Sequence, residues 1–186
     1  MRVIMRDGPH AATTRAVVAE AEMSLASFHY AFRSRDEMMR ELIASVVADE
    51  SVAALESIAA SSDIRTSIRR GLQSYFDLLV ADHRQEQVLL ELMHYSLRTP
   101  ELTDLPRQQY AHYRSAVAAV LQSAASAAHV DWTIPVEDVA RLIVTVTDGV
   151  TMAWLADRDD AAAARVLDFA ADSLAALARP VNGEPR

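Results

Sequence analysis

Residues 13–39 contain two short helical patterns separated by a tight turn and followed directly by the start of a third helix. In the second pattern, Leu25, Phe28 and Phe32 recur at the spacing of a buried stripe. Ser24 stands just before this pattern as a good N-cap. Two short helices joined by a tight turn are typical of the helix-turn-helix unit that reads double-stranded DNA.

The other face of the second pattern is small, polar and aromatic. It carries Ala26, Ser27, His29 and Tyr30. Small residues allow close approach to a major groove, and the polar side chains can hydrogen-bond phosphate oxygens or base edges. Ordinary helical bundles also contain short amphipathic helices, so the spacing alone leaves both a DNA reader and plain bundle packing open.

Capping residues predict where the neighbouring helices begin. Thr13 or Thr14 can cap the first helix, and Ser34 with Glu37 forms a capping box for the third. The apolar spacing predicts that the third helix runs from Asp36 to about Ala60.

The stretch resembles the N-terminal domain of the tetracycline-repressor (TetR) family of bacterial transcription regulators, whose usual pattern is Thr-x-x-x-Ile-Ala-x-x-Ala-Gly-Val-Ser-x-Gly-Thr-Leu-Tyr-x-His-Phe-x-Ser-Lys-x-x-Leu. Close matches stand at Thr13, Val17, Ala21, Ser24, Phe32 and Ser34. Near-equivalents stand at Met23, Ser27, Phe28, Arg35 and Met38.

This resemblance implies contacts with DNA. It assigns phosphate contacts to Thr14, His29 and Arg35, and base contacts to Leu25, Ala26, Ser27 and Tyr30. Arg15 completes the predicted DNA-binding set. Glu22 replaces the turn glycine of the family, so a bulky residue is expected at a positive φ, and it adds an anion near the DNA.

The start of the chain departs most from the family pattern. Only Met1–Asp7 precede Gly8, about two helical turns, where the family usually carries a full first helix. Val3 and Ile4 are then all that remains of its apolar face. We expect either a start codon assigned too late or a truncated first helix, and in the second case weak or absent DNA binding.

Composition and charge exclude several other classes. The chain has 186 residues, 51% of them hydrophobic, and its lack of cysteine excludes disulfides and thiolate sites. No apolar run is expected to span a bilayer and no signal peptide is visible, which predicts a cytoplasmic protein without a membrane partner. The net charge is −8, but residues 1–40 carry +1, so the acidic excess lies away from the predicted reader.

The remaining pattern predicts an all-α fold. Helices are expected at 65–81, 85–97, 105–128, 136–156 and 160–178, with a loop at 132–135. We expect a three-helix DNA-binding domain at residues 1–47, a helical ligand-binding and dimerisation domain at 48–179, and a flexible tail at 180–186.

The last two helices suggest a homodimer. The helix at 136–156 is apolar on more than one side, so more than one neighbouring element is needed to bury it. Both neighbours could belong to the core of the monomer, or one could come from a second copy of the chain. The resemblance implies a four-helix interface, with two readers about 34 to 36 Å apart on a palindromic operator. The predicted interface residues are Leu142, Val146, Val150, Trp154, Val166, Ala170 and Leu174.

The middle helices carry a predicted ligand-binding set: Tyr75, Leu79, Met93, His94, Leu97, Tyr110, Tyr113, Thr147 and Met152. These residues mix adaptable apolar groups with hydrogen-bonding tips, as pocket linings do, although stripes at this spacing are also ordinary core. The resemblance implies a small-molecule effector that releases DNA. Few charged side chains fall on the inward stripes, so a mostly apolar effector is expected.

No motif for catalysis, metal binding or a cofactor stands out. The histidines lack metal-ligand spacing, and neither a glycine-rich phosphate loop nor a nucleophile elbow is present. We therefore interpret the chain as a ligand-responsive transcriptional repressor and not as an enzyme. The main alternative is a helical ligand-binding or scaffold dimer that no longer binds DNA because its first helix is missing. A small helical enzyme is a second alternative, for which the sequence offers no credible pair of nucleophile and base.

Overall fold

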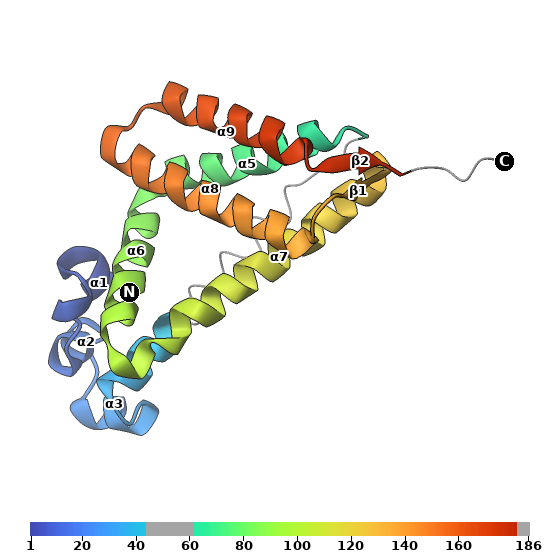
Figure 1. Ribbon diagram of the computed structural model, residues 1–186. Coiled ribbons are helices and arrows are strands. Elements are labelled where there is room, and N and C mark those ends of the chain that lie inside the picture. Colours follow the sequence, from blue (N-terminus) through green and yellow to red (C-terminus); the bar gives the residue numbers. More distant parts are fainter. Residues whose placement is uncertain (44–61, 182–186) are drawn as a thin grey trace. The chain divides into compact units, whose positions relative to one another are not determined.

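The computed structural model describes residues 1–43 and 62–181 and is almost entirely helical there, as the sequence predicts (Figure 1). The chain divides into two compact units. Unit 1 comprises Met1–Glu50 with Asp82–Tyr110, and unit 2 comprises Ser51–Ala81 with Ala111–Arg186. The predicted domain boundary after residue 47 and the predicted end of the third helix lie outside the described residues.

Unit 1 contains the three predicted N-terminal helices together with a later helix of the chain. Its elements are α1 (Arg2–Asp7), the 3₁₀ turn η1 (Pro9–Ala11), α2 (Thr14–Glu20), α3 (Leu25–Ala31), the helix that begins at Arg35, α6 (His83–Arg98), the 3₁₀ turn η2 (Pro100–Leu102) and the first part of α7 (Asp104–Ala128). Helix α6 contacts α1 and η1, so it completes this unit.

The predicted caps of α2 and α3 are confirmed. The side chain of Thr13 accepts a hydrogen bond from the amide of Ala16 at 3.2 Å, and Ser24 accepts one from Ser27 at 3.1 Å. Each cap satisfies one of the amides that a helix start leaves without an intrahelical partner. These local bonds fix where α2 and α3 begin.

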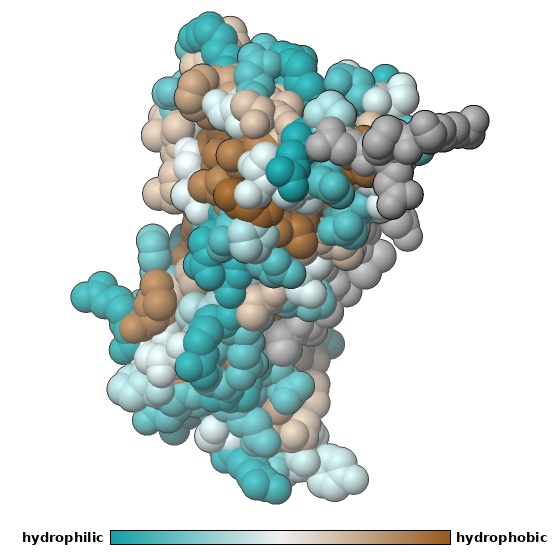
Figure 2. Space-filling model, turned by 45° about the vertical axis from the view of Figure 1, so that its right-hand side comes forward, coloured by the Kyte–Doolittle hydropathy of each residue, from teal (hydrophilic) through white to brown (hydrophobic). Residues whose placement is uncertain are grey.

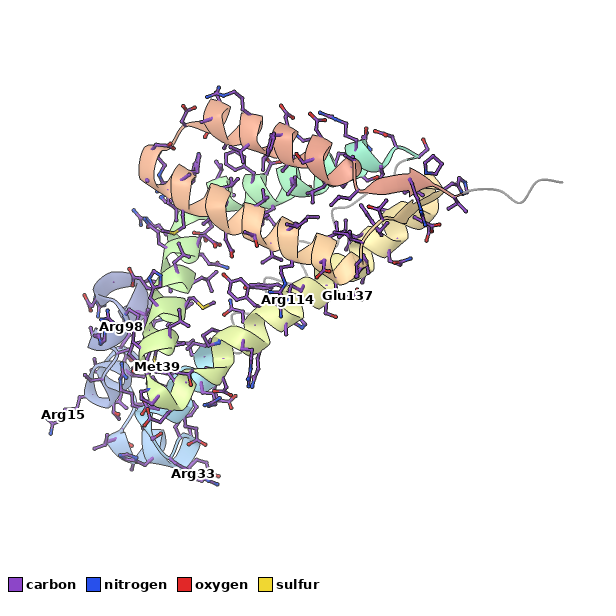
Figure 3. The ribbon with its side chains drawn as sticks, viewed as in Figure 1. Arg15, Arg33, Met39, Arg98, Arg114 and Glu137 are labelled. Carbon is purple, nitrogen blue, oxygen red and sulfur yellow. The ribbon has the colours of Figure 1, made fainter. Side chains whose placement is uncertain are left out.

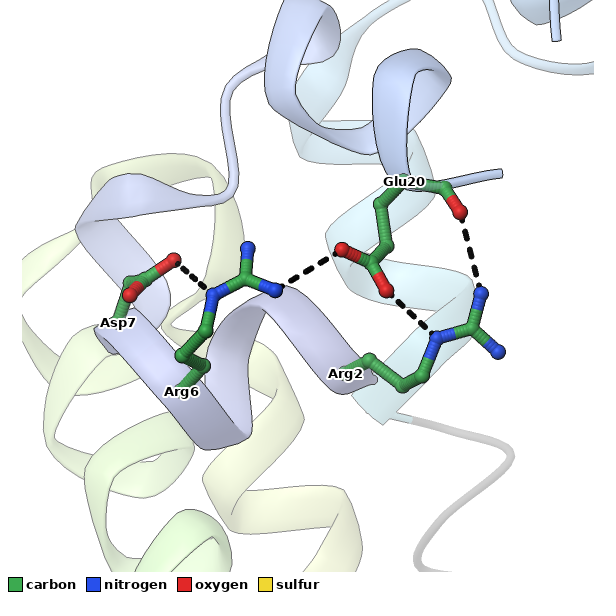
Figure 4. A network of polar contacts seen from close by, with 4 residues as sticks. All are labelled: Arg2, Arg6, Asp7 and Glu20. Carbon is green, nitrogen blue, oxygen red and sulfur yellow. Dashed lines mark hydrogen bonds and ion pairs between the residues drawn. The ribbon is translucent and has the colours of Figure 1, made fainter. Parts of the chain in front are cut away.

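Helix α1 is short but well anchored. Val3 and Ile4 are buried in the core of unit 1, as expected. Arg2 and Arg6 both donate hydrogen bonds to the carboxylate of Glu20 at the end of α2, at 2.7 and 3.0 Å (Figure 4). These bonds hold the pKa of Glu20 below its usual range. The stabilisation they give is therefore complete above the usual carboxylate pKa and is lost only as the pH falls through the lowered value.

Unit 2 is built on three long helices that lie side by side (Figure 1). Its elements are α5 (Ile64–Ala81), the remainder of α7, β1 (Val130–Trp132), α8 (Val136–Asp157), α9 (Asp160–Ala175) and β2 (Ala178–Pro180). Helix α5 packs along α9 and also contacts α8. Ion pairs from Arg65 to Asp172 (2.5 Å) and from Arg69 to Asp168 (2.6 Å) border the α5–α9 contact.

The two short strands correct the sequence analysis. Strands β1 and β2 pair antiparallel, with Val130 opposite Pro180, where a loop and the end of a helix were expected. The amide of Thr133 also donates to the carbonyl of Leu177 at 2.8 Å. These two segments lie far apart in the sequence, so their pairing produces no pattern that is visible in either segment alone. Pro180 therefore belongs to a strand rather than to the predicted tail, and the last part of that tail, residues 182–186, lies outside the described residues.

Helix α8 differs from the expectation in one respect. It is long and apolar enough, by length and composition alone, to cross a membrane, which the sequence analysis did not recognise. In unit 2 this helix packs against α5 and α9 and buries Val139, Val144 and Trp154. Apolar residues of α8 thus face the core of unit 2 on one side, and on the other side apolar residues such as Leu142 and Met152 are exposed.

Candidate nucleic-acid and dimer interfaces

Helix α3 presents the predicted outer face to solvent. Phe28 is 3% exposed and packs against the ring of Phe32, with the centroids 5.5 Å apart. On the opposite side Tyr30 is 96% exposed. Ala26, Ser27 and His29 are also exposed. The helix therefore has one aromatic side fixed in the core and one small, polar and aromatic side free to meet a partner.

Leu25 does not join the buried stripe that the spacing predicted. It is 48% exposed, because it is the first residue of α3 and lies beside the turn, beyond the core that Phe28 enters. The stripe prediction was wrong for this residue. Its exposure is compatible with the base contact that the family resemblance implies, which stays a prediction.

The turn between α2 and α3 closes as a Schellman motif around Glu22. The amide of Met23 donates to the carbonyl of Val18 at 2.9 Å, and the amide of Glu22 donates to Ala19 at 3.3 Å. Glu22 has a φ of 54°, so the expected positive φ at this non-glycine residue is confirmed. A left-handed conformation costs a residue with a Cβ about 1–2 kcal/mol, which the surrounding bonds must offset.

Glycine at position 22 should relieve this strain. We expect Glu22→Gly to raise the free energy of unfolding by roughly 0.5–1 kcal/mol, the relief exceeding the larger entropy of glycine in the unfolded chain. Glu22→Gln is the matched control, because it removes the charge and keeps the strain. Urea unfolding should separate the two variants, whereas both should bind duplex DNA more tightly at low salt than the parent protein does. Equal stability of the two variants would contradict the strain argument.

The start of α2 supplies two further predicted contacts. Thr14 is the first residue of α2 and is half-buried, whereas Arg15 is exposed. Figure 3 shows Arg15 extending away from the ribbon. No described residue holds its guanidinium, so its charge is available to an anion.

Arg35 lies differently from the predicted phosphate contact. Its Nε donates to the carbonyl of Ala12 at 2.7 Å and its Nη2 to the carbonyl of Pro9 at 2.6 Å. Its Nη1 donates to the hydroxyl of Tyr95, and its Cζ also lies 5.2 Å from the centroid of that ring. Arg35 therefore fastens the helix it opens to η1 and α6, and these internal bonds occupy all three nitrogens.

The seven predicted dimer residues surround one groove between α8 and α9. The groove has a volume of about 400 Å³ and an almost entirely apolar lining. Val150, Trp154, Ala170 and Leu174 are buried and form its floor. Figure 2 shows hydrophobic surface gathered over α8 and α9. The sequence analysis missed Phe169, which lines the same groove and is 71% exposed.

Gly149 lies in the middle of α8 and lines the groove. No described atom beyond its own helix backbone and immediate neighbours lies within 4 Å of the position that a Cβ would take. Glycine inside a helix costs about 1 kcal/mol relative to alanine, so a packing reason is expected. Among the described residues no helix crosses α8 at this point.

The predicted ligand-binding residues divide between the two units. Met93, His94, Leu97 and Tyr110 belong to unit 1, and Tyr75, Leu79, Tyr113, Thr147 and Met152 belong to unit 2. Within unit 2 the hydroxyl of Tyr75 is hydrogen-bonded to Thr151 at 2.5 Å, which joins α5 to α8. Among the described residues no group of three histidine or acidic side chains is arranged to hold a metal ion.

Family comparisons cover both parts of the chain. Residues 1–42 match the model of bacterial regulatory proteins of the tetR family, and residues 64–179 match that of the C-terminal domain of BetI-type transcriptional repressors. A curated relative, the HTH-type nicotine-responsive transcriptional repressor HdnoR of Paenarthrobacter nicotinovorans, is 29% identical over 160 residues. That match covers 86% of this chain and 81% of the relative.

Solved structures show the same fold. A transcriptional regulator from Rhodococcus sp. Rha1 superposes with a TM-score of 0.74 at 20% identity, covering 97% of this chain and 94% of the other. FadR from Bacillus subtilis, in complex with stearoyl-CoA, gives 0.69 at 16% identity, covering 94% and 92%. The second family model alone spans more than half of the chain. The chain therefore belongs to the tetR family of bacterial regulatory proteins, and it is a DNA-binding transcriptional repressor with a BetI-type C-terminal domain.

Proposed function

We propose that this repressor reads a palindromic operator as a homodimer, with α3 of each copy in the major groove, and that a mostly apolar effector releases it. The observation that carries the proposal is the division of α3 between the buried Phe28 and the exposed Tyr30. A recognition helix needs this combination, because its core side sets the orientation while its outer side meets base edges.

The groove between α8 and α9 supports the homodimer. An exposed apolar surface rimmed by polar residues marks a protein interface more often than a free surface. A helix of a second copy that approaches Gly149 closely would account for the glycine that nothing in the described protomer explains. Leu142, Val166 and Phe169 would then lose their exposure to water.

The effector is inferred from residue chemistry and from relatives. The predicted set contains apolar side chains, hydroxyls and His94, with no carboxylate or guanidinium. HdnoR responds to nicotine and the FadR structure contains stearoyl-CoA, and both molecules have substantial apolar parts. For release of DNA, the effector must bind more tightly to the conformation of the dimer that does not bind DNA. An effector with equal affinity for both conformations would not shift the equilibrium between them.

A gel-shift titration with the DNA that flanks the gene of this protein tests the proposal. A specific complex should persist against an excess of mixed-sequence competitor, with a stoichiometry of one dimer per site. A dimer that forms no specific complex with any flanking segment would favour the alternative of a ligand-binding or scaffold protein without DNA binding.

Thermal-shift screening tests the effector class. A ligand present at about 100 times its dissociation constant stabilises the folded protein by about 2.7 kcal/mol, which a melting curve detects easily. Mostly apolar compounds should stabilise the protein and also weaken the specific gel shift. Stabilisation by highly polar compounds alone would contradict the proposed class.

A further inference from the structure

Residues 1–40, which contain the helix-turn-helix, include six arginines, at positions 2, 6, 15, 33, 35 and 40. Four are held by protein groups: Arg2 and Arg6 by Glu20, Arg35 by Pro9, Ala12 and Tyr95, and Arg40 by Asp104. Arg15 and Arg33 have no such partner within the described part of the chain. Among the six arginines, these two therefore have guanidiniums that remain free to bind phosphate within the described part of the chain.

The backbone around Arg33 holds this side chain outward. Phe32 ends α3 in an extended conformation, with its amide donating to the carbonyl of Phe28 at 2.8 Å, and its ring packs against the unit 1 core. Arg33 follows in a bend and is exposed, so its side chain lies outside that core. Figure 3 shows it extending from the end of α3.

Two hydrogen bonds fix the position of this residue. The amide of Arg33 donates to the carboxylate of Glu37 at 2.5 Å, and the amide of Glu37 donates to the side chain of Ser34 at 3.1 Å. The predicted capping box is thus modified, because Glu37 reaches back to Arg33. Its carboxylate is engaged by a backbone amide, which leaves the guanidinium of Arg33 unpaired.

We propose that Arg33 is a phosphate-binding residue of this DNA reader and takes the role that the family pattern assigns to Arg35. The inference rests on the proposed docking of α3, since it needs that helix to lie against the duplex. Arg33 lies two residues after the end of α3 and Arg15 lies near the start of α2, and Figure 3 shows both side chains extending away from the ribbon of the helix-turn-helix. Phosphate contacts on either side of a recognition helix fix its register and carry no sequence information.

The salt dependence of binding to a fluorescent duplex of mixed sequence tests this role without knowledge of the operator. Each neutralised phosphate contributes about 0.9 to the slope of log affinity against log salt concentration. Arg33→Gln should therefore reduce the slope by about 0.9 per protomer, or about 1.8 per dimer, and weaken binding about tenfold at low salt. Arg33→Lys should restore the slope, because it keeps the charge.

The matched control is Arg70→Gln, which removes an exposed arginine from α5 in unit 2 and should leave the slope unchanged. All variants should melt at the temperature of the parent protein, since Arg33 and Arg70 are exposed and the guanidinium of Arg33 makes no hydrogen bond or ion pair within the described residues. If Arg33→Gln keeps the parent slope while the parent binds DNA, this inference is overturned and the proposed function stands. If the parent protein binds no duplex, both are overturned.

Discussion

Phe169→Glu is expected to convert the protein from dimer to monomer. Phe169 is 71% exposed and lines the α8–α9 groove, so in the proposed dimer its ring is buried against the second copy. Replacing a central aromatic residue of an interface commonly costs 2 kcal/mol or more, and burying an unpaired carboxylate adds to that loss. We expect the dissociation constant of the dimer to rise by about a hundredfold or more, as measured by size-exclusion chromatography with light scattering across a dilution series.

A matched substitution separates this effect from a general loss of solubility or fold. Leu78 is 46% exposed on α5 and does not line the groove, so Leu78→Glu should remain dimeric. Both variants should keep their helical circular dichroism. A Phe169→Glu protein that stays dimeric at the lowest concentration measured would exclude the groove as the interface, as would a parent protein that is monomeric at micromolar concentration.

Arg35→Ala is expected to destabilise unit 1 strongly. The guanidinium donates to three acceptors and lies against the ring of Tyr95, with only 25% of the side chain exposed. Hydrogen bonds from a charged donor contribute about 1.5–3 kcal/mol each, and truncation also leaves partly buried carbonyls without a donor. Discounting for partial exposure, we expect a loss of roughly 2–4 kcal/mol, measured by urea unfolding at fixed protein concentration.

Two further variants identify the cause of this loss. Tyr95→Phe keeps the ring and removes the hydroxyl acceptor, so it should lose about 1 kcal/mol. Arg35→Lys keeps the charge but cannot reach three separate acceptors, so it should recover only part of the loss. Should Arg35→Ala unfold within about 0.5 kcal/mol of the parent protein, as a surface substitution does, the internal role of Arg35 would be excluded.

The features that sequence predicted well are local. The caps at Thr13 and Ser24, the helix from residue 25 onward and the positive φ of Glu22 all depend on residues within about one helical turn. The long helices of unit 2 followed from the 3.6-residue apolar period, which a packed helix must show over its whole length.

The features that sequence missed depend on distant partners. Arg35 has acceptors 23, 26 and 60 residues away, so nothing beside it in the chain shows that its guanidinium is occupied. The pairing of β1 with β2 likewise joins segments that only the folded unit brings together. The sequence pattern of a family predicts a role for each position. Tertiary contacts determine whether the side chain at that position is free to perform the role.

The sequence does carry a signal for the exposed positions of Phe169 and Arg33. Phe169 follows Val166 by three residues, which marks a second apolar stripe on α9 beside the one that packs in unit 2. Arg33 lies between Phe32, which packs against the core, and the next helix start, in a short connection whose polar residues are expected to face solvent. Both signals lie on the outer face of an element, whereas the residues that form the core lie on the inner face.

The central claim is that α3 buries Phe28 and presents Tyr30 and its neighbours to a DNA duplex. The most direct test is a titration of the parent protein and Tyr30→Ala with the flanking DNA segment that gives a specific shift, at stated salt. Tyr30 is 96% exposed, so the variant should melt with the parent, lose about 1–3 kcal/mol of specific binding and keep its affinity for mixed-sequence DNA almost unchanged. Equal specific affinity of the two proteins would contradict the placement of α3 in the groove.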